Sequence, residues 1–300
     1  MYPVIAVVAG ISAAIVFGMS SAAEQRSTQR VQTRRALSPI ILLDLVRQPL
    51  WLIAIAGTVV GFTLQVVGLR YGPLALVEPL LVCDLIFAVL VTSYQRRRSD
   101  PIILGGAVAT AAGVAGFLVI GHPSTGQSTV SFLVVLPLAL GLAACVAGCL
   151  AVAGRHNGLR PLALALACGI CYGAAAFLVK LVVSDISGGL AQLLTDWPIY
   201  ALAVVGPVGF VLNQNAFQQG TLLAPVLAII TASDPIVSIA LAYLWLNEQL
   251  SSSPPAIAGQ VISLVIMITG IVVLAHHSPM VVQKLKEAEA AQRDTRSQQW

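Results

Sequence analysis

The chain has 300 residues, of which 58% are hydrophobic and 9% are charged, and its formal net charge is +4. A typical soluble domain carries about 25% charged residues, so a surface this poor in charge would not stay in solution. The composition therefore predicts a polytopic membrane protein and excludes a nuclease, a secreted disulfide scaffold and a disordered linker protein. The basic residues lie between apolar runs, so the positive charge does not indicate a nucleic-acid partner.

Nine apolar stretches are long enough to cross a bilayer, which requires about 20 residues in a helix. We expect helices because unpaired strands and loops would leave backbone groups without hydrogen bonds in hydrocarbon. The predicted fold is thus an all-α bundle of about nine transmembrane helices. In chain order the stretches are 2–23, 50–69, 73–94, 101–121, 130–153, 161–183, 197–217, 221–246 and 255–275.

The distribution of Lys and Arg predicts how the helices cross the membrane. All of the 16 basic residues except Arg70 and Lys180 lie in or beside alternate loops and in the C-terminal tail. Because positive loops stay in the cytoplasm, we expect an outside N-terminus and a cytoplasmic C-terminus in the plasma membrane. This orientation requires an odd number of crossings, which agrees with nine.

A weak internal duplication divides the chain into two units. Gly61 and Gly72 recur as Gly209 and Gly220 with the same spacing, and each pair precedes an apolar stretch that contains an aspartate, Asp84 or Asp234. Upstream, Phe17-Gly18 resembles Tyr172-Gly173. The predicted topology inverts one copy relative to the other, and inverted repeats are typical of transporters.

These observations predict four segments. Residues 1–121 form the first repeat, with a basic cytoplasmic loop at 24–49. Residues 122–160 form a connector helix with its loops, and residues 161–277 form the second repeat. Residues 278–300 form a polar cytoplasmic tail. Whether the basic loop or the tail binds a partner, or is only a solvated flank, is left open.

Part of the chain resembles a known family. The segment from Thr221 to Leu250 reads TLLAPVLAIITASDPIVSIALAYLWLNEQL, with a mid-helix proline followed by Asn-Glu-Gln-Leu at the helix end. This pattern resembles the second repeat of the drug/metabolite transporter superfamily, of the EamA-like type. The first half departs from it, since its helix ends in Gln95-Arg96-Arg97-Arg98. The nine-helix layout and the segment ICYGAAAFLVK (170–180) are similar to the NIPA-like magnesium-transporter branch.

Asp84 and Asp234 are the leading candidates for transport. Asp84 lies 12 residues beyond Gly72, or about 18 Å along a helix, which places it near the bilayer centre. Ionisable groups at that depth are costly and usually functional. We expect each aspartate to carry a proton or, if the protein is a cation permease, to bind the metal. The alternative is a neutral aspartate that hydrogen-bonds to a neighbouring helix.

Further polar and proline residues accompany the two aspartates. Pro235 frees a backbone carbonyl and predicts a helix break beside Asp234. Glu78-Pro79 is a second such pair, expected to lie nearer the outer surface. Gln65 and Asn213 occupy equivalent places in the repeat and could line the site, although such amides also join membrane helices to one another.

The leading hypothesis is a secondary transporter that moves a small solute by alternating access, coupled to protons or cations. The first alternative is a magnesium or other divalent-cation permease, and the second is a non-transporting membrane scaffold or assembly subunit. We expect no enzymatic activity and no cofactor, since the chain has no GxxxxGK[ST], HExxH or GxSxG motif. The expected partners are the solute or cation and the lipid bilayer, and a homodimer is left open.

Overall fold

A computed structural model describes residues 3–30, 49–95, 101–124, 126, 130–156, 158–185, 194–217 and 223–277. Within these ranges the regular secondary structure is helical throughout. The helices are α1 (Pro3–Arg30), α3 (Pro49–Tyr71), α4 (Leu74–Leu81), α5 (Cys83–Gln95), α6 (Pro101–Gly121), α7 (Phe132–Arg155), α8 (Arg160–Asp185), α10 (Trp197–Phe217), α11 (Leu223–Trp245) and α12 (Pro254–His277).

Seven segments of the described chain are long and apolar enough to cross a membrane, and α4 and α5 together make one of them. Shorter apolar stretches, Val4–Ser20 and Trp197–Asn213, lie in α1 and α10. Many large apolar side chains are exposed on the outside of the bundle, as lipid contact requires. The chain is therefore a multi-pass membrane protein, and the full count of nine crossings stays a prediction.

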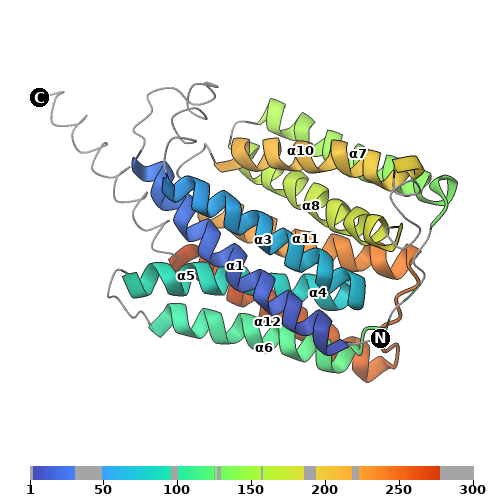
Figure 1. Ribbon diagram of the computed structural model, residues 1–300, viewed down its shortest axis with the longest axis horizontal. Coiled ribbons are helices and arrows are strands. Elements are labelled where there is room, and N and C mark those ends of the chain that lie inside the picture. Colours follow the sequence, from blue (N-terminus) through green and yellow to red (C-terminus); the bar gives the residue numbers. More distant parts are fainter. Residues whose placement is uncertain are drawn as a thin grey trace, which may run out of the picture.

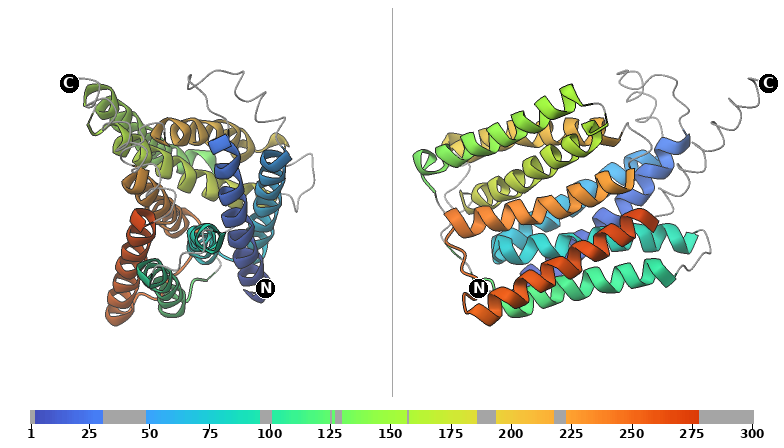
Figure 2. Two further views of the ribbon diagram at one scale, coloured as in Figure 1. Left: turned by 90° about the vertical axis from the view of Figure 1, so that its left-hand side faces the viewer. Right: turned by 180° about the vertical axis from the view of Figure 1, so that it is seen from behind.

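The helices pack in three groups (Figure 1). Helix α1 packs along α3 and along the broken pair α4–α5, whereas α8 packs along α10 and α11. Helices α6 and α12 form a third pair, and α7 lies at the edge of the bundle against α8 (Figure 2). We call α1, α3, α4 and α5 the α1 set, and α8, α10 and α11 the α8 set.

One end of the bundle holds the short turn Tyr71–Pro73 between α3 and α4, and we call it the turn end. Helix α1 begins there, where Ala6 lies against Gly72. Helices α3, α8 and α11 finish there, and α12 finishes at the opposite end (Figures 1 and 2). Helix α1 therefore starts at the end where α8 stops, so the two helices run in opposite directions.

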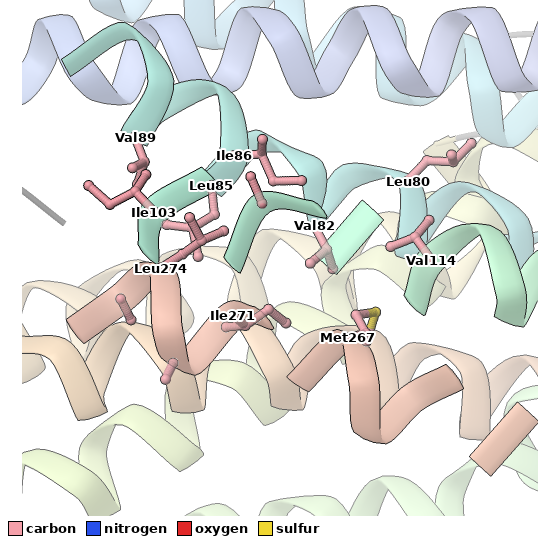
Figure 3. Close-up of a cluster of buried hydrophobic side chains, with 13 residues drawn as sticks. Leu80, Val82, Leu85, Ile86, Val89, Ile103, Val114, Met267, Ile271 and Leu274 are labelled. Atoms are coloured by element: carbon pink, nitrogen blue, oxygen red, sulfur yellow. The ribbon is translucent and has the colours of Figure 1, made fainter. Parts of the chain in front are cut away.

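An apolar core joins α4 and α5 to α6 and α12 (Figure 3). Small residues let α6 and α12 approach closely, as in many membrane helix pairs. A side chain at Gly113 would collide with the backbone of Met267, and one at Gly270 would collide with Thr110. The buried members that Figure 3 labels are Leu80, Val82, Leu85, Ile86, Val89, Ile103, Val114, Met267, Ile271 and Leu274.

The helix break that we expected at Pro235 is not present. Helix α11 runs through Pro235 without interruption, and the hydroxyl of Ser238 donates to the Pro235 carbonyl at 3.1 Å. A proline removes only one helical hydrogen bond, and packing on neighbouring helices maintains the rest. The interruption lies instead at Val82, between α4 and α5, three residues after Pro79.

Several expectations concern residues outside the described ranges. They include most of the basic loop 24–49, the arginines Arg96, Arg97 and Arg98, Gly220 in the second repeat, and the tail 278–300.

All five cysteines lie within the described chain and are free thiols.

Candidate functional site: three acids inside the helix bundle

Glu78 lies in the short helix α4, four residues after its start. Its side chain is 3% exposed, and Gln65 Nε2 from α3 donates to Glu78 Oε1 at 3.2 Å. Two of the predicted site residues are therefore in direct contact. The bond satisfies one carboxyl oxygen of a group that is costly to bury without a partner.

Asp84 lies in the first turn of α5, immediately after the break at Val82. The Leu85 N–H donates to the Val82 carbonyl oxygen at 3.4 Å and lies close enough to the Asp84 carboxylate to interact with it, and the N-terminal end of a helix favours negative charge. Gly18 of α1 allows close packing here, because a Cβ atom on it would lie 2.5 Å from the Asp84 carbonyl oxygen. The break thus gives Asp84 a helix N-terminus, and the glycine brings α1 against it.

Asp234 lies in the interior of α11. Gly173 of α8 packs against it, and a Cβ atom on Gly173 would lie 2.7 Å from the Asp234 carbonyl oxygen. The side chain of Asp234 interacts electrostatically with both Glu78 and Asp84. The structure therefore places Asp234 of α11 within electrostatic range of Glu78 and Asp84, the two predicted acids of α4 and α5.

Asn213 of α10 faces the same region. The hydroxyl of Tyr172 is in hydrogen-bonding contact with the side chains of Asn213 and Cys168, and Cys168 lies close enough to Asp234 to interact with it electrostatically. Tyr172 and Cys168 are thus additional members of the site. The pairing of Tyr172-Gly173 with Phe17-Gly18 was the sequence signal that could have indicated Tyr172.

The two helix sets build their halves of the site with corresponding contacts. The ring of Phe17 lies over Gly61, where a Cβ atom would be 2.8 Å from it, and the ring of Tyr172 lies over Gly209 at a corresponding 3.0 Å. Gln65 and Asn213, four residues after these glycines, are the amides that reach the cluster. The residues paired in the sequence therefore occupy corresponding places in the bundle.

Two buried oxygen atoms of the site have unused hydrogen-bonding capacity. Oδ1 of Asp234 and Oδ1 of Asn213 lack a hydrogen-bond partner among the described residues. Buried polar atoms are almost always paired, so such exceptions need an explanation. An incoming proton, cation or hydrogen-bond donor would supply the missing partner.

The described residues do not include a group of three or more His, Cys, Asp or Glu side chains arranged to hold a metal ion. The three acids interact electrostatically but are not arranged to bind one metal ion together. The arrangement can bind a proton, a hydrated cation or a positively charged group of a larger solute.

Comparison with known proteins gives one relative with high coverage. The chain is 26% identical over 282 residues to an uncharacterized protein of Corynebacterium glutamicum, a match that covers 92% of this chain and 96% of the relative. No family model matches the chain. No solved structure matches it either.

Proposed function

We propose that the chain is a secondary transporter that moves a small solute across the plasma membrane by alternating access, coupled to protons or cations. The observation that carries this proposal is the meeting of Glu78, Asp84 and Asp234 deep in the bundle. Three acids at one place inside hydrocarbon are costly, and such groups mark substrate and proton pathways. The unpaired oxygen of Asp234 supports the proposal because it retains the capacity to accept a proton or another donor.

We further propose that the two helix sets are inverted repeats of the drug/metabolite transporter type. The set α1, α3, α4–α5 and α6 would correspond to α8, α10, α11 and α12, with α7 as the connector and nine crossings in all. The corresponding glycine contacts at Asp84 and Asp234 and the opposite directions of α1 and α8 support this correspondence. In such transporters the two halves rock around a central site.

The proposed orientation follows from the basic residues. An outside N-terminus and a cytoplasmic C-terminus would make the turn end the outer end of the protein. The expected cytoplasmic loops carry most of the arginines, which favours this orientation over its reverse.

The test is transport by purified protein in liposomes that contain a pH-sensitive dye. A panel of amines, amino acids, nucleosides and sugars is added outside under an imposed proton gradient, and solute-dependent proton movement is recorded. We expect at least one solute to drive proton movement, Asp234→Asn to abolish that movement and Asp84→Asn to reduce it strongly. Asp196 is a partly exposed acid that precedes α10, so Asp196→Asn is the matched control and should retain the wild-type rate of proton movement.

Other outcomes would replace the proposal. Entry of Mg²⁺ into liposomes that hold a magnesium-sensitive dye, without proton movement and dependent on both aspartates, would identify a divalent-cation permease. If cells that carry the aspartate variants keep the wild-type phenotype, while cells that carry the deletion of 278–300 lose it, the chain is a membrane scaffold.

A further inference from the structure

Lys180 joins α8 to the C-terminal end of α3. Its Nζ donates to the carbonyl oxygens of Leu69 and Gly72, each at 2.5 Å. The last carbonyls of a helix have no partner within the helix and favour a positive charge nearby. Lys180 therefore caps α3 from a different helix set.

Glu248 joins the segment after α11 to the N-terminal end of α4. Its two carboxylate oxygens accept the N–H groups of Leu74 at 2.7 Å and Ala75 at 2.9 Å. The residue that precedes α4 is Pro73, which makes no side-chain cap of its own. A distant carboxylate thus supplies the cap that the local sequence lacks, and charge-assisted bonds of this kind are strong.

The segment that carries Glu248 is itself tied to α6 and α12. The Ser251 N–H donates to Gly121 O at 2.8 Å, and the Ser124 N–H donates to Gln249 O at 3.0 Å. Gln260 Nε2 of α12 donates to the Ser251 carbonyl at 2.8 Å. Glu248 is therefore held on one part of the protein while it binds α4, which belongs to another.

An apolar layer lies beside these polar contacts at the turn end. Its central members are fully or almost fully buried, so this end of the bundle is closed. They are Leu69, Leu74, Val77, Phe177, Leu181, Leu241 and Leu246. Val77 is adjacent to Glu78, so the layer lies between the acid cluster and the turn end.

Apart from α6 and α12, which pack on each other along their length, the α1 and α8 sets contact each other mainly near the turn end. Helices α8 and α11 pack on α4, whereas α5, which continues beyond the break at Val82, has no comparable contact with either. Exposure follows the same direction, because Glu78 is buried while Asp84 and Asp234 are partly exposed. In the described state the turn end is filled by apolar side chains between α3, α4, α8 and α11.

We propose that Lys180 and Glu248 form a latch on the α3–α4 turn, and that release of this latch opens the turn end toward Glu78. The proposal rests on the transport function proposed above, since it assigns the latch to one gate of the cycle. Lys180 and Glu248 act as positioning residues, because they hold the helix ends and do not belong to the acid cluster.

The electrostatics of the latch allow both states. Burial raises the pKa of Glu248 above its ordinary value, while the N–H groups of Ala75 and Leu74 and the charge of Lys180 oppose that shift. Opening returns the carboxylate to water and removes the desolvation penalty, at the expense of the two N–H bonds. These opposed contributions make the latch releasable.

The test measures the distance between two spin labels in the purified full-length protein. The labels are attached at Arg70→Cys and Gln249→Cys, both exposed positions on opposite sides of the latch, in a background without the five native cysteines. We expect the parent protein to give mainly one short distance. Glu248→Ala and Lys180→Met should each add a longer component.

The expected size of the longer-distance component follows from the loss of the helix caps. Glu248→Ala leaves two buried N–H groups without an acceptor in the closed state, which should raise the ratio of open to closed protein by about tenfold or more. Lys180→Arg retains the charge and the donors and should stay mainly closed. Asp196→Ala, which removes an acid outside the latch, is the control and should leave the distances unchanged.

Unchanged distances in folded Glu248→Ala and Lys180→Met would overturn the latch and leave two structural helix caps. If Glu248→Ala does not fold, the comparison of Lys180→Met with Lys180→Arg decides. The measurement needs no substrate, so its failure is distinct from failure of the transport proposal, which depends on Asp84 and Asp234 in liposomes.

Discussion

The glycine contacts beside the two aspartates allow a quantitative prediction. In Gly18→Ala the new Cβ would lie 2.5 Å from the Asp84 carbonyl oxygen, and in Gly173→Ala it would lie 2.7 Å from that of Asp234. Both neighbours are helix backbone, which cannot rotate away as a side chain can. The helices must therefore separate by several tenths of an ångström or more before ordinary contact is restored.

The size of the effect can be isolated with two control glycines. Overpacking a tight interior costs about 1–3 kcal/mol, but Gly→Ala in a helix also gains up to about 1 kcal/mol of helix propensity. Gly105→Ala and Gly148→Ala share that gain, and their Cβ atoms would meet nothing within 4 Å. The difference between the two pairs should therefore be the packing term alone, roughly a 5- to 150-fold change in the folded-to-unfolded ratio.

The assay is thermal unfolding of the four purified variants in one detergent, followed by intrinsic fluorescence. We expect Gly18→Ala and Gly173→Ala to unfold at clearly lower temperatures than Gly105→Ala and Gly148→Ala. If all four unfold together, the helices do not approach at these glycines, and the correspondence between Asp84 and Asp234 loses its structural basis.

Three further predictions concern the polar contacts. Gln65→Leu leaves Oε1 of Glu78 without its donor and should lower the free energy of unfolding by about 1–3 kcal/mol, whereas Thr63→Val on the exposed face of the same helix should not; thermal unfolding compares them. Tyr172→Phe should reduce solute-driven proton movement in liposomes several-fold and, because it removes the hydroxyl partner of Asn213, should also lower the unfolding temperature modestly; a wild-type rate of proton movement would remove Tyr172 from the site. The pKa of Glu248 is raised in the latched state, so binding of a proton to Glu248 stabilises that state. The additional fraction of latched protein should be fully present below the ordinary Glu248 pKa of 4.5 and should be lost as the pH rises through the raised pKa. The spin-label distances should depend on pH in this way in the parent protein and should not do so in Glu248→Ala. Lys180 is the charged group that interacts with Glu248 over this pH range.

The positions of the helices were predictable because each requires a long apolar run. The helices of the described chain lie within a few residues of the expected stretches, apart from the extension of α1 to Arg30. The pairing of Phe17-Gly18 with Tyr172-Gly173 was also visible, since close helix packing constrains residue size at single positions.

The helix break and the latch could not be predicted in the same way. Proline alone does not decide where a helix stops, and packing kept α11 intact at Pro235 while the chain broke at Val82. The contact between Glu248 and Leu74 joins residues 174 positions apart, so no local pattern indicates it. In the sequence Glu248 belongs only to a helix-end motif, and the pattern that predicts the site does not include Lys180.

The break at Val82 makes the two aspartates chemically unequal although they occupy corresponding places. Asp84 lies in the first turn of α5, at the positive end of that helix, and beside the Leu85 N–H. Asp234 lies inside a continuous helix, and its Oδ1 has no hydrogen-bond partner among the described residues. The N-terminal end of α5 offsets part of the charge of Asp84, whereas Asp234 retains the capacity to accept a new donor. We therefore expect Asp234 to bind the proton or cation first, with Asp84 and Glu78 adding negative potential around it, so that Asp234→Asn should impair coupling more severely than Asp84→Asn in the liposome assay.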